Sequence, residues 1–133
     1  MQLSDELQWR GFVNQMTFAD IEDVNQPRTF YFGVDPSSDS MTIGNLAAAM
    51  MVRLFIDHGH KAYLLVGGAT GMIGDPDGKK DEREIRRAED VVHNKMAIIE
   101  QYRSLFAGRD FEIVDNHDWF KDINYIEFLH RIG

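Results

Sequence analysis

The sequence predicts an α/β fold in which helices flank a parallel sheet, and three observations support this prediction. The 133 residues are 44% hydrophobic and 11% aromatic, which is enough for one domain with a buried core. Short segments rich in aromatic and β-branched residues predict strands at 29–35, 61–66 and 111–114. Longer segments between and after these strands show helical spacing of apolar residues. Strands that alternate with helices form parallel sheets with right-handed crossovers.

The first predicted element is an amphipathic helix near the N-terminus. Ser4 is a suitable cap, the apolar pattern continues to about Met16, and Gly11 is a candidate break. The strand at 29–35 then ends in the turn-forming run Asp35-Pro36-Ser37-Ser38.

The segment 44–58 is the second predicted helix, and Gly59 provides a left-handed stop. Its expected core face consists of Leu46, Met50, Leu54 and Phe55. The strand at 61–66 opens into the run Gly67-Gly68-Ala69-Thr70-Gly71. This run is so rich in glycine that only a loop is expected there.

A charged stretch at 79–87 precedes a long amphipathic helix that ends at Gly108. A last helix is expected at 125–132, after the strand at 111–114. The residues expected to face the core from these helices are Val92, Met96, Ile99, Phe106, Ile126, Leu129 and Ile132, and Met50 and Met51 are expected in the core as well. His58 and His60 flank the stop at Gly59 and are expected at a helix end or the surface, and the other histidines show no metal-ligand spacing.

Charge and composition exclude several classes of protein. With 14 basic and 22 acidic side chains the net charge is −8, so no broad attraction to nucleic acid is expected. The lack of cysteine excludes a disulfide framework and thiolate metal sites. Neither a signal peptide nor an apolar run of membrane-spanning length is found, so we expect a soluble cytoplasmic protein.

The loops after the first two strands lie where open parallel sheets bind ligands. In the first loop, Gly33 allows a ligand to approach the backbone, and Ser37 and Thr42 offer hydroxyls. Ile43-Gly44-Asn45 begins a helix whose positive end can face a phosphate. An alternative that is equally consistent with this loop is that Pro36, Ser37, Ser38 and Asp39 form an ordinary turn plus N-cap.

The second loop, 67–80, contains five glycines, so its backbone must come close to a ligand or to another segment. Its spacing does not fit the phosphate-binding loop Gly-x-x-x-x-Gly-Lys-Ser/Thr, and it contains no Gly-x-Gly-x-x-Gly. Generic dinucleotide binding is therefore disfavoured.

Four short motifs resemble those of tyrosyl-tRNA synthetases, which are class I aminoacyl-tRNA synthetases. Thr42-Ile43-Gly44-Asn45 is similar to the class I signature His-Ile-Gly-His, and the runs at 31–36, 35–41 and 67–80 are similar to the tyrosyl enzymes in particular. The resemblance begins at about residue 28. It implies that 28–133 form a Rossmann-like core, the N-terminal half of an ATP- and tyrosine-binding catalytic domain, and that a helical segment at 1–27 precedes it.

The resemblance also implies roles for single residues. Tyr31 would meet the phenol of the substrate, Thr70 would line the same pocket, and Asp75 would accept the α-ammonium group. The residues matched to ATP binding are Gly33, Asp35, Ser37, Thr42, Gly44 and Asn45. Lys79 and Arg83 match mobile basic residues that neutralise the leaving pyrophosphate, and together with Ser37, Thr42 and Asn45 they are the candidates for catalysis.

Thr42 and Asn45 stand where the family more often has histidine, so neither position carries a positive charge. Both side chains still donate hydrogen bonds, and we expect activity with altered phosphate contacts. The Thr-Ile-Gly-Asn variant also resembles some tryptophanyl-tRNA synthetases, which makes a fragment of that sister family one alternative. Tyr31 and the Gly-Asp-Pro run favour tyrosine. The other alternative is a non-catalytic nucleotide-binding module derived from a synthetase.

The implied reaction is attack of the L-tyrosine carboxylate on the α-phosphorus of ATP, which carries Mg²⁺ on its phosphates, followed by transfer to tRNA(Tyr). No tightly bound cofactor and no protein nucleophile are expected. Family members form homodimers. They also carry a Lys-Met-Ser-Lys-Ser type loop and tRNA-binding domains, and neither this loop nor these domains are found before Gly133. The chain alone is therefore expected to fold at least partly and not to aminoacylate tRNA.

Overall fold

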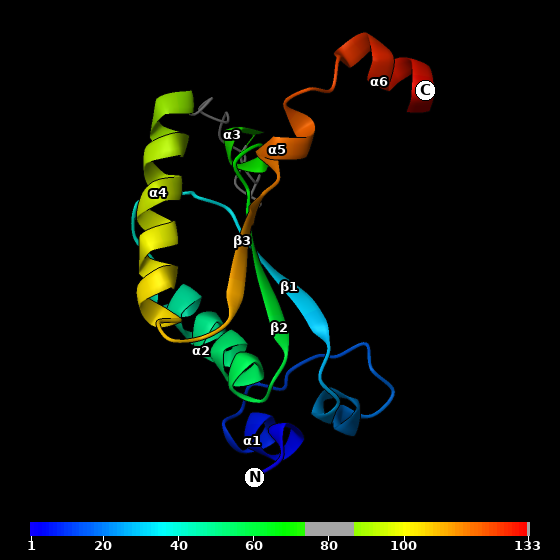
Figure 1. Ribbon diagram of the computed structural model, residues 1–133, viewed down its shortest axis with the longest axis vertical. Helices are drawn as coiled ribbons and strands as arrows, with labels where there is room; N and C mark the ends of the chain where they lie inside the picture. The colour runs from blue at the N-terminus through cyan, green and yellow to red at the C-terminus, as the bar shows by residue number, and fades with distance from the viewer. Residues whose placement is uncertain (74–86, 133) are drawn as a thin grey trace.

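A computed structural model describes residues 1–73 and 87–132, and it contains one parallel sheet (Figure 1). The strand order is β1-β2-β3, with β1 at Thr29–Val34, β2 at Lys61–Val66 and β3 at Phe111–Asp115. The register pairs Val34 with Val66 and Val66 with Asp115, so all three strands end at the same edge of the sheet. The predicted α/β fold with a parallel sheet is confirmed.

The two long helices, α2 (Ile43–Asp57) and α4 (Ala88–Leu105), cover the same face of the sheet (Figure 1). This follows from the strand order, because successive right-handed crossovers that step in one direction place their helices on one side. The main core lies between these helices and the sheet and is formed by Ala49, Val52, Ile56, Ala62, Leu64, Val66, Ile98, Ile99, Tyr102 and Phe106. Along each strand, alternate residues point to the other face, which is open among the described residues.

The N-terminal segment contains α1 (Leu3–Trp9) and a 3₁₀ helix, η1 (Ile21–Asn25). The helix does not extend to Met16, because the chain turns with φ of 72° at Gly11, the residue that the sequence indicated as a candidate break. Ser4 is not the N-cap. It lies inside α1, where its buried hydroxyl accepts a hydrogen bond from Asn25 Nδ2 at 2.9 Å and so joins α1 to η1.

The expected core faces of the long helices are partly wrong. Leu46 and Met50 are exposed on α2, since the helix packs on β2 through Ala49, Val52 and Ile56. On α4, Val92 and Met96 are exposed, whereas Val91, Ile98, Ile99 and Tyr102 are buried. In α4 the prediction thus mistook Val92 for its buried neighbour Val91.

The last helix, α6 (Tyr125–Ile132), forms at the predicted residues, but its expected core face is exposed. Ile126, for example, is 71% exposed, because no described element packs on this helix, which extends away from the sheet in Figure 1.

Two short helices were not predicted: α3 (Thr70–Ile73), within the expected glycine-rich loop, and α5 (His117–Phe120). None of the helices in the described ranges is both long and apolar enough to span a membrane.

Candidate functional site

The loops after β1 and β2 meet at the carboxyl edge of the sheet. Thr70 Oγ1 donates a hydrogen bond to Asp35 Oδ1 at 2.6 Å, and Gly67 N donates to Val34 O at 2.9 Å. A Cβ atom added to Gly67 would lie 1.9 Å from Asp35 Oδ1 and 2.3 Å from Thr70 Oγ1. Gly67 is therefore required because a carboxylate and a hydroxyl lie directly against its backbone.

The end of β3 contributes two residues that sequence reasoning missed. Asn116 is buried; its Oδ1 accepts from Ala69 N at 2.8 Å and its Nδ2 donates to Thr70 Oγ1 at 3.1 Å. Asp115 Oδ1 accepts from Gly68 N at 3.1 Å. The polar run 115–117 at the carboxyl end of a predicted strand is the signal that could have indicated this position.

Tyr31 lies on the open face of the sheet and is 71% exposed. It lines a shallow apolar cavity of about 350 Å³, to which β2 contributes Leu65, β3 contributes Val114 and α5 contributes Trp119. Gly33 alternates onto the same face, and a Cβ atom added there would meet nothing within 4 Å. The arrangement suits an aromatic ring laid across the strands beside the backbone of Gly33.

The N-terminus of α2 is closed by a reciprocal capping box. Thr42 Oγ1 accepts from Asn45 N at 3.2 Å, and Asn45 Oδ1 accepts from Thr42 N at 2.9 Å and from Thr42 Oγ1 at 2.7 Å. The N-cap of α2 is therefore Thr42 and does not lie among Pro36, Ser37, Ser38 and Asp39, where the alternative interpretation of the sequence placed a turn and an N-cap. Since Oδ1 of Asn45 does the capping, its Nδ2 makes no hydrogen bond within the described residues and stays available to a ligand.

The loop between β1 and α2 is fixed on α4. Gln101 Oε1 accepts from Met41 N at 2.9 Å, while its Nε2 donates to Asp39 O at 2.8 Å. Asn94 Nδ2 donates to Pro36 O at 3.2 Å, and within the loop Ser37 N donates to Asp35 O at 2.8 Å. These bonds position the loop without using the side chains of Ser37 or Thr42.

Comparison with known proteins decides the family. A sequence model described as tRNA synthetases class I (W and Y) matches residues 22–133. The chain belongs to this family of class I tRNA synthetases. The resemblance stated from the sequence motifs is thereby confirmed at the level of the family.

Similar proteins of this family include the Tyrosine--tRNA ligase of Levilactobacillus brevis, 42% identical over 137 residues, and the Tyrosine--tRNA ligase 2 of Bacillus anthracis, 43% identical over 141 residues. Each alignment covers 100% of this chain and 33% of the relative, so the chain spans about a third of the length of these synthetases.

Solved structures of the family share the fold. The C-terminally truncated mitochondrial tyrosyl-tRNA synthetase of Aspergillus nidulans superposes with a TM-score of 0.76 at 22% identity, over 96% of this chain and 41% of that one. The corresponding enzyme of Coccidioides posadasii gives 0.68 at 22% identity, over 100% and 40%. The fold is therefore that of part of a class I synthetase catalytic domain.

The structure brings together some of the predicted synthetase residues and leaves others apart. Tyr31 and Gly33 share the open face, and Asp35 contacts Thr70 at its edge, next to Ser37. At the start of α2, Thr42 lines a separate cavity of about 480 Å³ against α4, and Gly44 and Asn45 belong to the same turn of the helix.

Asp75, Lys79 and Arg83 lie outside the described residues. Among the described residues, no group of three or more His, Asp or Glu side chains is placed to hold a metal ion.

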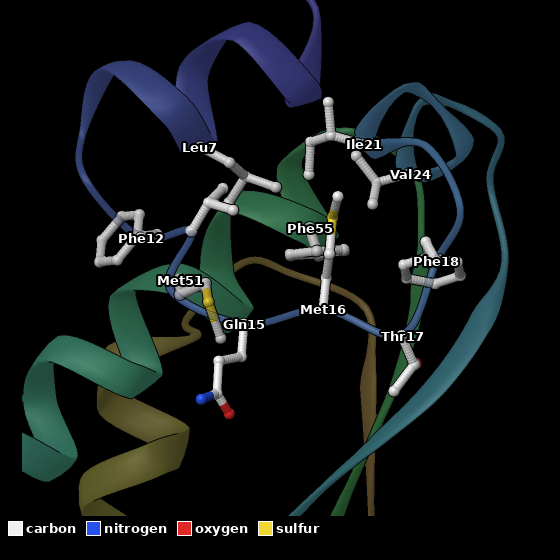
Figure 2. A pocket seen from close by; sticks show the side chains of 11 residues that line it. Leu7, Phe12, Gln15, Met16, Thr17, Phe18, Ile21, Val24, Met51 and Phe55 are labelled. Atoms are coloured by element: carbon white, nitrogen blue, oxygen red, sulfur yellow. The ribbon is translucent and has the colours of Figure 1, made fainter.

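Another cavity of the described residues, of about 630 Å³, does not lie at this edge. Figure 2 shows it between the N-terminal segment and α2, lined by Leu7, Phe12, Met16, Phe18, Met51 and Phe55 among others. It contains no charged side chain and none of the predicted site residues. The candidate site is therefore the smaller cavity at Tyr31, together with the polar edge beside it.

Proposed function

We propose that the protein containing this chain is a tyrosine--tRNA ligase, which activates L-tyrosine with ATP and transfers it to tRNA(Tyr). One observation carries the proposal. The loops that follow β1 and β2 are joined by the Thr70–Asp35 hydrogen bond at 2.6 Å, at the end of the strand that presents Tyr31 and Gly33 on its open face. The names of the relatives support tyrosine as the amino acid.

On the amino-acid side, the cavity at Tyr31 would hold the substrate ring between Leu65, Val114 and Trp119. The hydroxyl of Tyr31 would bond the substrate phenol. Phenylalanine would be rejected because it leaves that hydroxyl unpaired in a desolvated pocket. Asp75 would pair with the α-ammonium group, as the resemblance implies, and Thr70 would lie between the two ends of the substrate.

On the nucleotide side, Gly33 would allow the α-phosphate to approach the strand, with Asp35 and Ser37 beside it. As the resemblance implies, Thr42, Gly44 and Asn45 would face the outer phosphates and the ribose, so the ATP would extend from the open face of β1 to the start of α2. The Nδ2 of Asn45, which makes no hydrogen bond among the described residues, is a donor suited to this role. Mg²⁺ would be bound through the phosphates of ATP and enter with its substrate.

The substrate carboxylate would attack the α-phosphorus, forming tyrosyl-adenylate as the bond to pyrophosphate breaks. The protein would contribute orientation, donors directed at the phosphates, and the cations Lys79 and Arg83 for the leaving group. We also infer, from the resemblance alone, that the whole protein is a homodimer that acts in the cytoplasm; sedimentation of the natural full-length protein tests the dimer.

The test is amino-acid-dependent exchange of pyrophosphate into ATP, using the longest natural reading frame that contains this sequence. We expect exchange with tyrosine and little with tryptophan or phenylalanine. Tyr31→Phe should lower the preference for tyrosine over phenylalanine by about tenfold, the effect of one lost hydrogen bond. Tyr125→Phe is the matched control, since Tyr125 is equally exposed, at 72% against 71%, and lies on α6.

The outcomes separate the candidates. Exchange that depends on tryptophan instead of tyrosine would assign the chain to the sister family. Unchanged discrimination in Tyr31→Phe would remove Tyr31 from the pocket. A full-length protein that binds ATP and exchanges with no amino acid would be a non-catalytic module.

A further inference from the structure

One carboxylate at the end of β3 joins three elements. Asp115 Oδ1 accepts hydrogen bonds from Gly68 N at 3.1 Å and from His117 N at 2.9 Å, and Asp115 Oδ2 accepts from Lys95 Nζ at 2.7 Å. Asp115 thus connects the loop after β2, the start of α5 and the middle of α4. Neither Lys95 nor Asp115 matches any of the motifs on which the family resemblance depends.

The contact between Asp115 and the loop is built into the backbone. A Cβ atom added to Gly68 would lie 2.3 Å from Asp115 Oδ1 and 2.7 Å from Oδ2, so only glycine permits this approach. A Cβ atom added to Gly67 would in the same way lie 1.9 Å from Asp35 Oδ1. Gly67 and Gly68 are therefore held between two carboxylates, that of Asp35 directly after β1 and that of Asp115 at the end of β3.

Lys95 determines how the Asp115 carboxylate is oriented. The two side chains are 22% and 17% exposed, whereas the pair Arg103–Glu100 on the same helix is mostly exposed. A largely buried carboxylate without a partner is costly, and the bond to Lys95 on Oδ2 leaves Oδ1 directed at the two amides. Burial raises the pKa of Asp115, but the hydrogen bonds from Lys95, His117 and Gly68 outweigh it, so the pKa lies below its usual value.

Hydrogen bonds of the next two residues of the loop connect Gly68 to the proposed substrate pocket. Ala69 N bonds Asn116 Oδ1 at 2.8 Å, and Thr70 Oγ1 bonds Asp35 at 2.6 Å. A shift of Gly68 away from Asp115 would move Thr70 relative to Asp35 and Tyr31.

We propose that Lys95 and Asp115 form a positioning pair that holds residues 68–70 in the geometry needed to bind the amino acid. The inference rests on the proposed function, because it assigns the loop to amino-acid recognition. Loss of the pair should weaken tyrosine binding more than ATP binding, since the nucleotide contacts proposed at the start of α2 are fixed separately by Gln101.

The test uses the longest natural reading frame and measures pyrophosphate exchange for Lys95→Met, Asp115→Asn and the double variant. Each single variant should raise KM for tyrosine about tenfold and change KM for ATP and kcat by less than about threefold. The double variant should resemble the worse single variant, because each change alone already breaks the pair. Lys95→Arg keeps a cation and its donors and should restore KM for tyrosine to within about threefold. Lys95→Gln, which keeps an amide donor, replaces Lys95→Met if that variant does not fold.

Lys61→Met is the matched control. It removes the 2.6 Å ion pair between Lys61 and Glu112, which joins β2 to β3 at the opposite end of the sheet, and should leave KM unchanged. A wild-type protein without tyrosine-dependent exchange would overturn the proposed function and this inference with it. An active wild type whose Lys95 variants keep the normal KM for tyrosine, or whose single effects add in the double variant, would overturn this inference alone. An equal rise in both KM values with a lower melting temperature would also overturn it, since that is the result of a purely structural pair.

Discussion

At the scale of single residues, the glycines of the candidate site are explained in two different ways. Gly67 and Gly68 leave no room for a side chain, because the Asp35 and Asp115 carboxylates occupy that space. Gly33 has nothing within 4 Å of an added Cβ atom, and its backbone conformation does not require glycine. Nothing in the described part of the chain therefore explains Gly33, whereas a ligand lying against β1 does.

Gly33→Ala is expected to separate stability from activity. An alanine in this strand should leave the free energy of unfolding unchanged or raise it by up to about 1 kcal/mol, because glycine is the less favourable residue in a strand. The added methyl group would stand where the substrate approaches, so the KM for ATP or tyrosine should rise by about tenfold or more. Denaturant unfolding and pyrophosphate exchange measure the two effects.

Gly67→Ala provides the contrast. Its methyl group must displace Asp35 or Thr70, so it should lower stability by about 1–3 kcal/mol and reduce activity together. A Gly33→Ala variant with normal kinetics would show that no ligand lies at this part of β1.

At the scale of elements, sequence patterns predicted the three strands to within one residue, because runs of β-branched and aromatic residues stop at clear turn signals such as Asp35-Pro36. They were less able to predict which helix face is buried. That face depends on the partner surface: Ala49 is buried because a small side chain lets α2 approach β2, whereas the larger Met50 points outward.

Of the site, the alternation of strands and helices predicted that the loops after the first two strands lie at the ligand-binding edge of a parallel sheet, and the hydrogen bond between Thr70 and Asp35 joins these two loops at that edge. Asn116 and Asp115 were missed, because a polar residue after a strand is common and only the sheet order places these two beside the glycine loop. Helices α3 and α5 were missed because one turn is too short to show periodicity.

His60 illustrates how a single side chain joins elements that are distant in sequence. Its surface position was predicted wrongly: it is 5% exposed, its ring packs at 5.1 Å from that of Phe55, and Nε2 lies 2.9 Å from Val24 O. Arg28 N donates to Nδ1 at 3.3 Å, so Nδ1 must be unprotonated and Nε2 carries the hydrogen donated to Val24. Neutral His60 thus ties η1 and the start of β1 to the turn before β2.

We expect stability to fall in mild acid because of His60. Burial lowers the pKa of His60 from 6.5, and the neighbouring charges of His58 and Arg28 lower it further. The unfolded chain therefore binds this proton at a higher pH than the folded protein. The free energy of unfolding should be unaffected well above pH 6.5 and decrease as the pH falls from there towards the folded pKa.

Urea unfolding between about pH 5 and pH 8 measures this dependence. His60→Gln can donate to Val24 and accept from Arg28 without titrating, so its stability should depend less on pH over the same range. The exposed His93→Gln is the control and should follow the wild type. Equal pH dependence in all three proteins would contradict the assignment to His60.

For the molecule as a whole, the described part of the chain covers only one face of its sheet. Both crossovers step in the direction β1-β2-β3, which places α2 and α4 on one side of the sheet (Figure 1). Tyr31, Tyr63, Leu65 and Val114 line the cavity on the other side. A site that binds a small substrate tightly usually buries most of the ligand surface. The cavity at Tyr31 is too open for this, and the chain spans only 33% of the length of its relatives.

The 133-residue chain alone should therefore fold around its α2–α4 core yet give exchange about 100-fold or more below that of the longest natural reading frame. Its open apolar face should bind a hydrophobic dye such as ANS, and Tyr31→Asp, which places a charge on that face, should reduce the dye signal. Leu46→Asp is the matched control, since Leu46 is exposed on the opposite, helix-covered side. Tyrosine-dependent exchange by the 133-residue chain at the rate of the longer protein would contradict this expectation, because it would show that residues 1–133 already enclose the substrate.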